Sequence, residues 1–326
     1  MTAGTPPAGA APAAVPWRRL AWVTWRQHRT ALTWMLIALA LTATGLALAD
    51  VTVRHAGAEH RYFSLMAGPW ADYIHLGVIL SLVMPVLAGV LLGAPLVARE
   101  AENGTTMLAW TQDASRTRWL LAQAVPVAVL LAVAAAALQL EFGRLSGLRA
   151  GLAWSAWSPE AFTLHPLPLA GWTALAFSLG VLLGAVIRRT VPAIAATIAC
   201  ATALYATAAL WRVFYLPPLH VAVPARFSGT YYSWGRLPTA ASPSGGADDI
   251  SNALGQRDGR LLSYAEVTNH TASWLRMHHL SLWITYQPAA RYATFQLIEF
   301  GWLTVLSVGL IAATVIVIRR RSAPAA

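Results

Sequence analysis

The chain has 326 residues, of which 57% are hydrophobic and only 11% charged, and this balance excludes an ordinary soluble domain and indicates a membrane protein. All 23 basic residues are arginines, so no lysine is available for a phosphate-binding P-loop, and the chain cannot itself be a P-loop ATPase. The net charge of +10 does not indicate nucleic acid binding, because the arginines cluster at the ends of apolar runs, where membrane topology explains them.

The N-terminal region divides into a tail and an amphipathic segment. Residues 1–16 are mostly Ala, Pro, Gly and Thr without a charged side chain, which predicts a disordered tail. In residues 17–30, Trp17, Leu20 and Trp25 share one face of a helix that arginines flank. This pattern predicts an interfacial helix that leads into the first membrane span, with a plain basic flank as the alternative.

Six apolar stretches follow, each close to the roughly 20 residues that a helix needs to cross the hydrocarbon of a bilayer. They are residues 31–49, 74–98, 119–140, 167–187, 191–211 and 296–318. The predicted fold is therefore an all-α polytopic membrane protein with six transmembrane helices, five of them within residues 31–211.

Glycines and prolines inside the spans predict local irregularities. The pairs Gly89 with Gly93 and Gly180 with Gly184 have the small-xxx-small spacing that lets helices approach closely, although a chain rich in glycine and alanine also produces such pairs by chance. Three prolines are predicted to bend or locally unwind their spans: Pro85, Pro95 and Pro126.

The arginines also predict how the chain crosses the membrane. One set of short connections is rich in arginine, namely residues 17–30, 99–118, 188–190 and 319–326, whereas the opposite short loops hold few. The positive-inside rule places the arginine-rich set in the cytoplasm, so both termini are predicted to be cytoplasmic and the protein to be a multi-pass protein of the cell membrane. The short link at residues 188–190 also predicts a tight hairpin between the fourth and fifth spans.

Three segments are predicted to lie outside the cell, at residues 50–73, 141–166 and 212–295. Residues 212–295 form a large extracytoplasmic loop before the last span, long enough to fold as a small lid. Earlier in the chain, Ser158-Pro159-Glu160 has the residue types of an N-cap, a first helical position and a first-turn acid, which predicts a short helix.

The sequence predicts no metal, no cofactor and no enzymatic activity of the chain's own. The adjacent His278 and His279 invite a metal hypothesis, but no zinc-type spacing of ligands accompanies them. There is no nucleophile elbow and no pair of intramembrane acids, and Glu141 and Glu299 lie near the ends of spans, where both are expected to reach water.

The polar stretch of residues 99–118 carries more chemistry than a simple connector needs. Acids open it, Gly104 allows the backbone to reverse, an apolar group that includes Trp110 follows, and arginines lie at its exit. By spacing alone two interpretations stand equal: a short helix that transmits motion from a docked protein, or a capped loop that packs on its own bundle.

A family resemblance favours the first interpretation. The run from Glu102 to Leu120, with Gly104-Thr105 and a downstream Ser115-Arg116, resembles the cytoplasmic connector of ABC-2 type transporter permeases, especially actinobacterial ones. Residues 188–193 are similar to the inner link between the fourth and fifth spans of these proteins.

The resemblance implies that residues 99–118 form a coupling stretch that sits in a groove of a separate ATP-binding subunit. The residues it assigns to contact or shape are Glu100, Glu102, Gly104, Thr105 and Trp110, with Arg116 placing the following helix. It further implies a dimer with a second permease copy, identical or not. Only Glu100-Ala101 matches the importer-type loop, so an exporter is favoured. The alternative is an ATP-independent secondary carrier or a membrane scaffold, although a carrier should show more polar groups near mid-membrane.

Overall fold

The computed structural model describes residues 17–54, 71–102, 116–144, 157, 159–224, 226–228, 231–233, 248–255 and 281–320. These residues belong to two compact units: unit 1 contains Met1–Leu148, Leu164–Leu204 and Glu299–Ala326, and unit 2 contains Arg149–Thr163 and Tyr205–Ile298. The predicted tail at residues 1–16, most of the coupling stretch at residues 103–115 and the last six residues of the chain lie outside the described residues.

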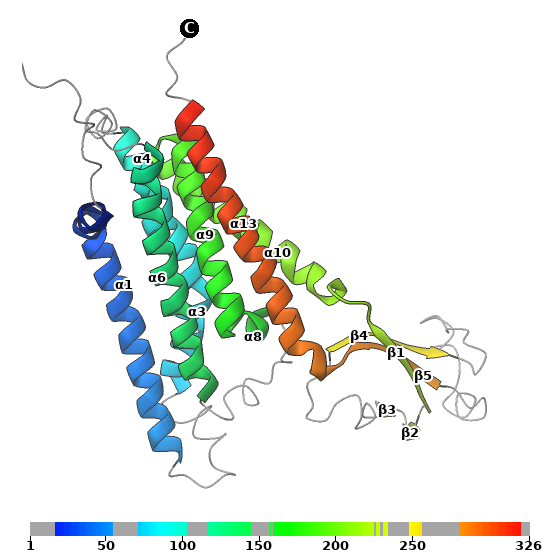
Figure 1. The fold of residues 1–326 in the computed structure, drawn as a ribbon. Coiled ribbons are helices and arrows are strands. Elements are labelled where there is room, and N and C mark those ends of the chain that lie inside the picture. The colour runs from blue at the N-terminus through cyan, green and yellow to red at the C-terminus, as the bar shows by residue number, and fades with distance from the viewer. Residues whose placement is uncertain are drawn as a thin grey trace, which may run out of the picture. The chain divides into compact units, whose positions relative to one another are not determined.

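Unit 1 is built of helices. Helix α9 packs against α6 and against the run formed by α3, η1 and α4, and α1 packs against α6 (Figure 1). The bounds are α1 (Trp17–Arg54), α3 (Ala71–Leu87), the π-helical turn η1 (Ala88–Gly93), α4 (Ala94–Glu102), α6 (Arg116–Arg144), α9 (Pro166–Ile187), α10 (Thr190–Trp211) and α13 (Tyr292–Arg320). Helices α10 and α13 each have one end in unit 2.

Within the described residues, five helical runs are long and apolar enough to cross a membrane. They are His75–Glu102, Thr117–Gly143, Pro166–Ile187, Thr190–Phe214 and Tyr292–Arg320. These runs confirm the second to sixth predicted spans in position and composition.

The predicted first span lies in α1. Thr33–Gly45 of this helix is an apolar segment among the residues whose side chains the structure describes, and the count of six spans stays a prediction. Helix α1 is continuous over 38 residues, so the predicted interfacial segment at residues 17–30 and the predicted span at residues 31–49 form one helix. The location of its first turns in a membrane interface stays a prediction.

The second span contains a π-helical turn instead of regular α-helix throughout. In this turn, η1, the N–H of Ala94 donates to the carbonyl oxygen of Gly89, five residues earlier. The residue after Ala94 is Pro95, which has no N–H to donate and whose ring would clash with the carbonyl four residues before it in a regular α-helix. The wider turn relieves that clash, which agrees with the predicted local unwinding at Pro95. By contrast, α6 continues through Pro126 without a change of helix type.

The two glycine pairs face each other across the contact between η1 and α9. A Cβ atom at Gly89 would lie 2.5 Å from the carbonyl oxygen of Ala176, and one at Gly180 would overlap the carbonyl oxygen of Gly89. Added Cβ atoms at Gly93 and Gly184 would likewise overlap backbone oxygens of the opposite segment. The four glycines therefore form a close backbone-to-backbone contact, and the packing interpretation of their spacing is confirmed.

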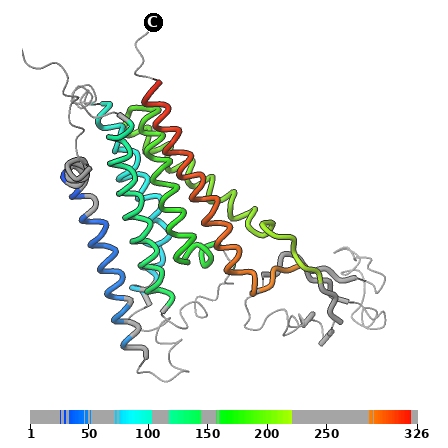
Figure 2. Tube along the Cα trace, viewed as in Figure 1, coloured from blue at the N-terminus to red at the C-terminus, as the bar shows by residue number. Residues whose placement is uncertain are grey.

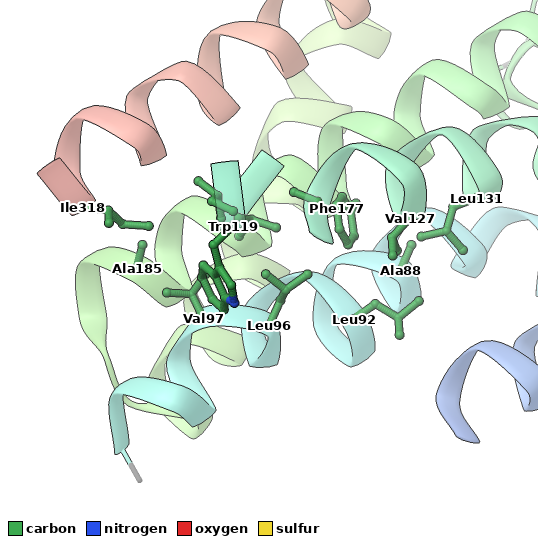
Figure 3. Packing of buried hydrophobic residues seen from close by; sticks show 13 residues of the cluster. Ala88, Leu92, Leu96, Val97, Trp119, Val127, Leu131, Phe177, Ala185 and Ile318 are labelled. Atoms are coloured by element: carbon green, nitrogen blue, oxygen red, sulfur yellow. The ribbon is translucent and has the colours of Figure 1, made fainter. Parts of the chain in front are cut away.

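Apolar side chains from five helical elements surround this contact (Figure 3). Leu92 and Leu96 come from η1 and α4, Trp119 comes from the start of α6, Phe177 comes from α9, and Ile318 comes from the end of α13. The core of unit 1 thus extends to the helix ends where the coupling stretch leaves and re-enters the bundle.

Unit 2 contains the only strands among the described residues, which departs from the all-α prediction. Strands β1, β5 and β4 form an antiparallel sheet in that order, and β2 pairs with β3. Its element bounds are α8 (Pro159–Thr163), η2 (Arg212–Phe214), β1 (Leu219–Pro224), β2 (Arg226–Ser228), β3 (Tyr231–Ser233), β4 (Asp248–Gly255), β5 (Ser281–Gln287) and η3 (Ala289–Arg291). The short helix predicted from Pro159 and Glu160 is confirmed as α8.

An aromatic cluster holds unit 2 together. The rings of Phe295 and Tyr292 contact Trp157 edge to face, with centroids 4.9 and 5.2 Å away. The buried guanidinium of Arg212 lies 4.1 Å from the ring centroid of Phe162 in a cation–π contact. These contacts join α8, η2 and the start of α13.

Candidate functional site

Three of the six predicted coupling residues lie at the two rims of the polar stretch. Glu100 and Glu102 are in the last turn of α4, where Glu100 is half-buried and Glu102 is exposed. Arg116 is the first residue of α6. Gly104, Thr105 and Trp110 fall outside the described residues.

The first rim is bonded to the start of α10. The backbone N–H of Thr190 donates to Oε1 of Glu102 over 2.8 Å, and the Thr190 hydroxyl donates to Oε2 over 2.6 Å. Thr190 is the first residue of α10, where helix N–H groups lack partners within the helix and negative charge is favourable. Arg189 and Arg99 add favourable charge interactions with the same carboxylate. We call this contact the Glu102–Thr190 clasp.

The clasp depends on a very short link between α9 and α10. Arg188 ends α9 in the left-handed conformation, with φ 59° and ψ 13°, and its N–H donates to the carbonyl oxygen of Gly184 over 3.0 Å. It is the one residue other than glycine with a positive φ in the described part of the chain. This reversal lets α10 begin only two residues later, which brings the N–H and hydroxyl of Thr190 against Glu102.

The second rim is bonded to the end of α13. The Nε–H of Arg319 donates to the hydroxyl oxygen of Thr117 over 2.9 Å. We call this hydrogen bond the Thr117–Arg319 clasp. Next to it, Trp119 and Ile318 belong to the same apolar cluster (Figure 3). Both rims of the coupling stretch are therefore bonded to helices that are distant in sequence.

Sequence reasoning placed one acid wrongly. Glu299 was expected to reach water, but its side chain is 0% exposed. The indole N–H of Trp172 in α9 donates to Oε1 of Glu299 over 2.8 Å, and the ring of Trp302 contacts Trp172 edge to face at 5.7 Å. Helical spacing could not have shown this, because α13 is apolar on every face and no stripe in the sequence marks the side that packs against α9.

The described residues contain no group of three or more His, Cys, Asp or Glu side chains that could hold a metal ion. His278 and His279 lie outside the described residues. The candidate site is thus the set of helix ends that the two clasps join, and its chemistry consists of hydrogen bonds and charge.

Long apolar helices packed through glycine contacts define a polytopic helical membrane protein. A family model described as ABC-2 membrane transporter related matches residues 30–212, more than half of the chain. The chain belongs to this family of membrane transporter proteins. No curated protein and no solved structure matches it. The match includes both stretches that carry the resemblance, residues 102–120 and 188–193, and it ends before the strands of unit 2.

Proposed function

We propose that the chain is the membrane-spanning permease subunit of an ABC exporter in the cell membrane. In this proposal a separate ATP-binding subunit hydrolyses ATP and docks on the coupling stretch, the permease has no enzymatic activity of its own, and two permease copies work as a dimer. The observation that carries the proposal is that both rims of the coupling stretch are held by clasps. A docked protein that displaces the stretch therefore also acts on α10 and α13, to which its two rims are hydrogen-bonded.

The distribution of charge supports a cytoplasmic location for this end of unit 1. Arg99, Arg188 and Arg189 lie next to the Glu102–Thr190 clasp in sequence, and Arg319 and Arg320 end α13. By the positive-inside rule such a gathering of arginines marks the cytoplasmic side. The same rule supports cytoplasmic termini, and the proposal counts α1 as a sixth span.

The docking half of the proposal is tested by charge reversal. The full-length permease is co-expressed with its candidate ATP-binding subunit, and the amount of that subunit that co-purifies is measured. We expect Glu100→Arg combined with Glu102→Arg to abolish association. Asp72→Arg is the matched control, because Asp72 is an exposed acid at the opposite end of the same helical run.

A second control separates docking from the clasp. Thr190→Val removes the hydroxyl that donates to Glu102 but leaves the acids of the stretch unchanged, so association should persist. Unchanged association of the doubly reversed variant, or loss of association in Asp72→Arg to the same extent, would contradict docking at the coupling stretch.

One observation favours a second candidate function, an ATP-independent secondary carrier. Glu299 is a buried carboxylate in a span, and intramembrane acids commonly serve ion or proton pathways. Reconstitution of the permease alone distinguishes the two candidates: a carrier moves substrate down an imposed ion gradient without a partner, and Glu299→Gln abolishes that movement. The exporter moves substrate only with its ATP-binding subunit and ATP.

A further inference from the structure

We propose that Thr190 and Thr117 are positioning residues that transmit movement of the coupling stretch to α10 and α13. The inference rests on the proposed function and deepens it, because it names the helices that respond and the contacts that make them respond. The stretch is covalently attached to α4 and α6, yet its two clasps lead to helices that begin or end far away in the sequence, 88 and 202 residues from the bonded partner.

The packing of unit 1 favours α10 and α13 as the parts that move. Among the five spans in the described residues, α10 and α13 are the least buried and α9 is the most buried. The run of η1 and α4 is locked to α9 by backbone contacts at Gly89 and Gly184, where no side chain could yield. Fewer intramolecular contacts therefore hold α10 and α13, and contacts at their ends have a correspondingly larger influence on their positions.

Both helices continue from unit 1 into unit 2 without a break. In α10, residues 190–204 belong to unit 1 and residues 205–211 to unit 2, and in α13 residues 292–298 belong to unit 2 and the remainder to unit 1. The Cα trace shows each as an unbroken helix (Figure 2). A hydrogen-bonded helix moves largely as one body, so a displacement at Thr190 or Arg319 moves the part of α10 or α13 that belongs to unit 1.

The chemistry of the Glu102–Thr190 clasp suits a contact that is made and broken repeatedly. Thr190 supplies two donors to one carboxylate but carries no charge of its own, and Glu102 is exposed, so opening the contact leaves no buried charge behind. Water can replace both hydrogen bonds, which keeps the difference between the closed and open states small. Such a contact favours its closed state slightly over its open state, so both states remain accessible.

The test uses the single cysteine of the chain as a reporter. Cys200 is exposed on α10 within unit 1, so an environment-sensitive fluorophore attached there reports movement of that helix without any added cysteine. The complex of labelled permease and unlabelled, cysteine-free ATP-binding subunit is placed in lipid nanodiscs, and the emission change on adding ATP with vanadate is measured. Co-purification of the subunit is measured on the same samples.

We expect the ATP-dependent emission change to fall about twofold to tenfold in Thr190→Val, the range expected for loss of one hydrogen bond in a coupled system. Thr190→Ser keeps the hydroxyl and should restore the change. Thr304→Val is the matched control, since the Thr304 hydroxyl is exposed and bonds only within α13, to the carbonyl oxygen of Phe300. Thr190→Ala provides a second removal of the hydroxyl if the valine variant does not assemble.

The outcomes separate the inference from the proposed function. If the unaltered permease binds the subunit but its probe does not respond, or if Thr190→Val and Thr190→Ala respond as fully as the unaltered chain, the inference is wrong and the proposed function stands. If no ATP-binding subunit associates with the unaltered permease, the proposed function fails and the inference fails with it.

Discussion

The contact between η1 and α9 makes a sharp prediction for Gly89→Ala. The new Cβ would lie 2.5 Å from the carbonyl oxygen of Ala176 and 3.0 Å from Cγ2 of Thr197, whereas ordinary contact begins near 3.4 Å. The backbones of η1 and α9 must therefore separate by about 0.9 Å, and overpacking of this kind costs about 1–3 kcal/mol, here toward the upper end because a carbonyl oxygen cannot rotate away.

The matched control is Gly301→Ala on α13, where an added Cβ meets nothing within 4 Å. Removing a glycine from a helix there should stabilise the protein by about 0.5–1 kcal/mol. Because both variants gain this same term, the free energy of unfolding, measured by titration with a denaturing detergent, should differ between them by the overpacking cost of about 1–3 kcal/mol. Equal stability of Gly89→Ala and Gly301→Ala would refute the backbone-to-backbone packing of η1 and α9.

Substitutions at two other places in unit 1 test further features of its structure. Trp172→Phe removes the indole N–H that donates to the buried carboxylate of Glu299, and it should lower the free energy of unfolding by about 1.5–3 kcal/mol. Combining it with Glu299→Gln should cost less than the sum of the two single changes. Additive costs would show that the hydrogen bond contributes nothing. Arg188→Gly should stabilise the α9–α10 link by up to about 1 kcal/mol, whereas Arg188→Val should destabilise it by about 1–2 kcal/mol, because a β-branched residue resists a φ of 59°. The same unfolding titration checks both, and equal stability of the glycine and valine variants would contradict the left-handed conformation of Arg188.

The spans could be predicted closely because their limits have local causes. The fourth and fifth were placed at residues 167–187 and 191–211, and α9 and α10 occupy Pro166–Ile187 and Thr190–Trp211. Apolar composition sets the length of each helix, and the adjacent arginines set its end. Residues 17–49 were harder, since arginine near a helix start does not by itself break the helix, and α1 continues through them.

The strands of unit 2 were missed although a local signal was present. β5 reads Ser-Leu-Trp-Ile-Thr-Tyr-Gln, with the aromatic and β-branched residues that favour strands, and β1 contains two valines. These segments are six and seven residues long, and the partner of each strand lies more than 20 residues away in the sequence. Without the pairing, a short apolar run in a long loop does not distinguish a strand from an irregular segment.

The glycine pairs and the clasps show what spacing cannot reveal. The small-xxx-small pattern indicates that a helix can approach another backbone closely, but it does not identify that backbone. The backbone that Gly89 approaches is that of Ala176, 87 residues later in the sequence. Glu102 and Thr190 were each assigned to a stretch with a family resemblance, yet nothing in either stretch required the two to meet. Long-range contacts of this kind follow from the packing of whole helices.

The contact at Glu102 also reconciles the two interpretations of the coupling stretch, a docking element or a capped loop that packs on its own bundle. An ionised carboxylate offers about four acceptor positions, so the two hydrogen bonds from Thr190 leave others free to face outward from an exposed residue. A protein that docks here, as we propose, competes for the same carboxylate that caps α10. The cap is then the part of the bundle that docking disturbs first. Loss of the Thr190 hydroxyl in Thr190→Val should therefore leave association intact and weaken the ATP-dependent movement of α10.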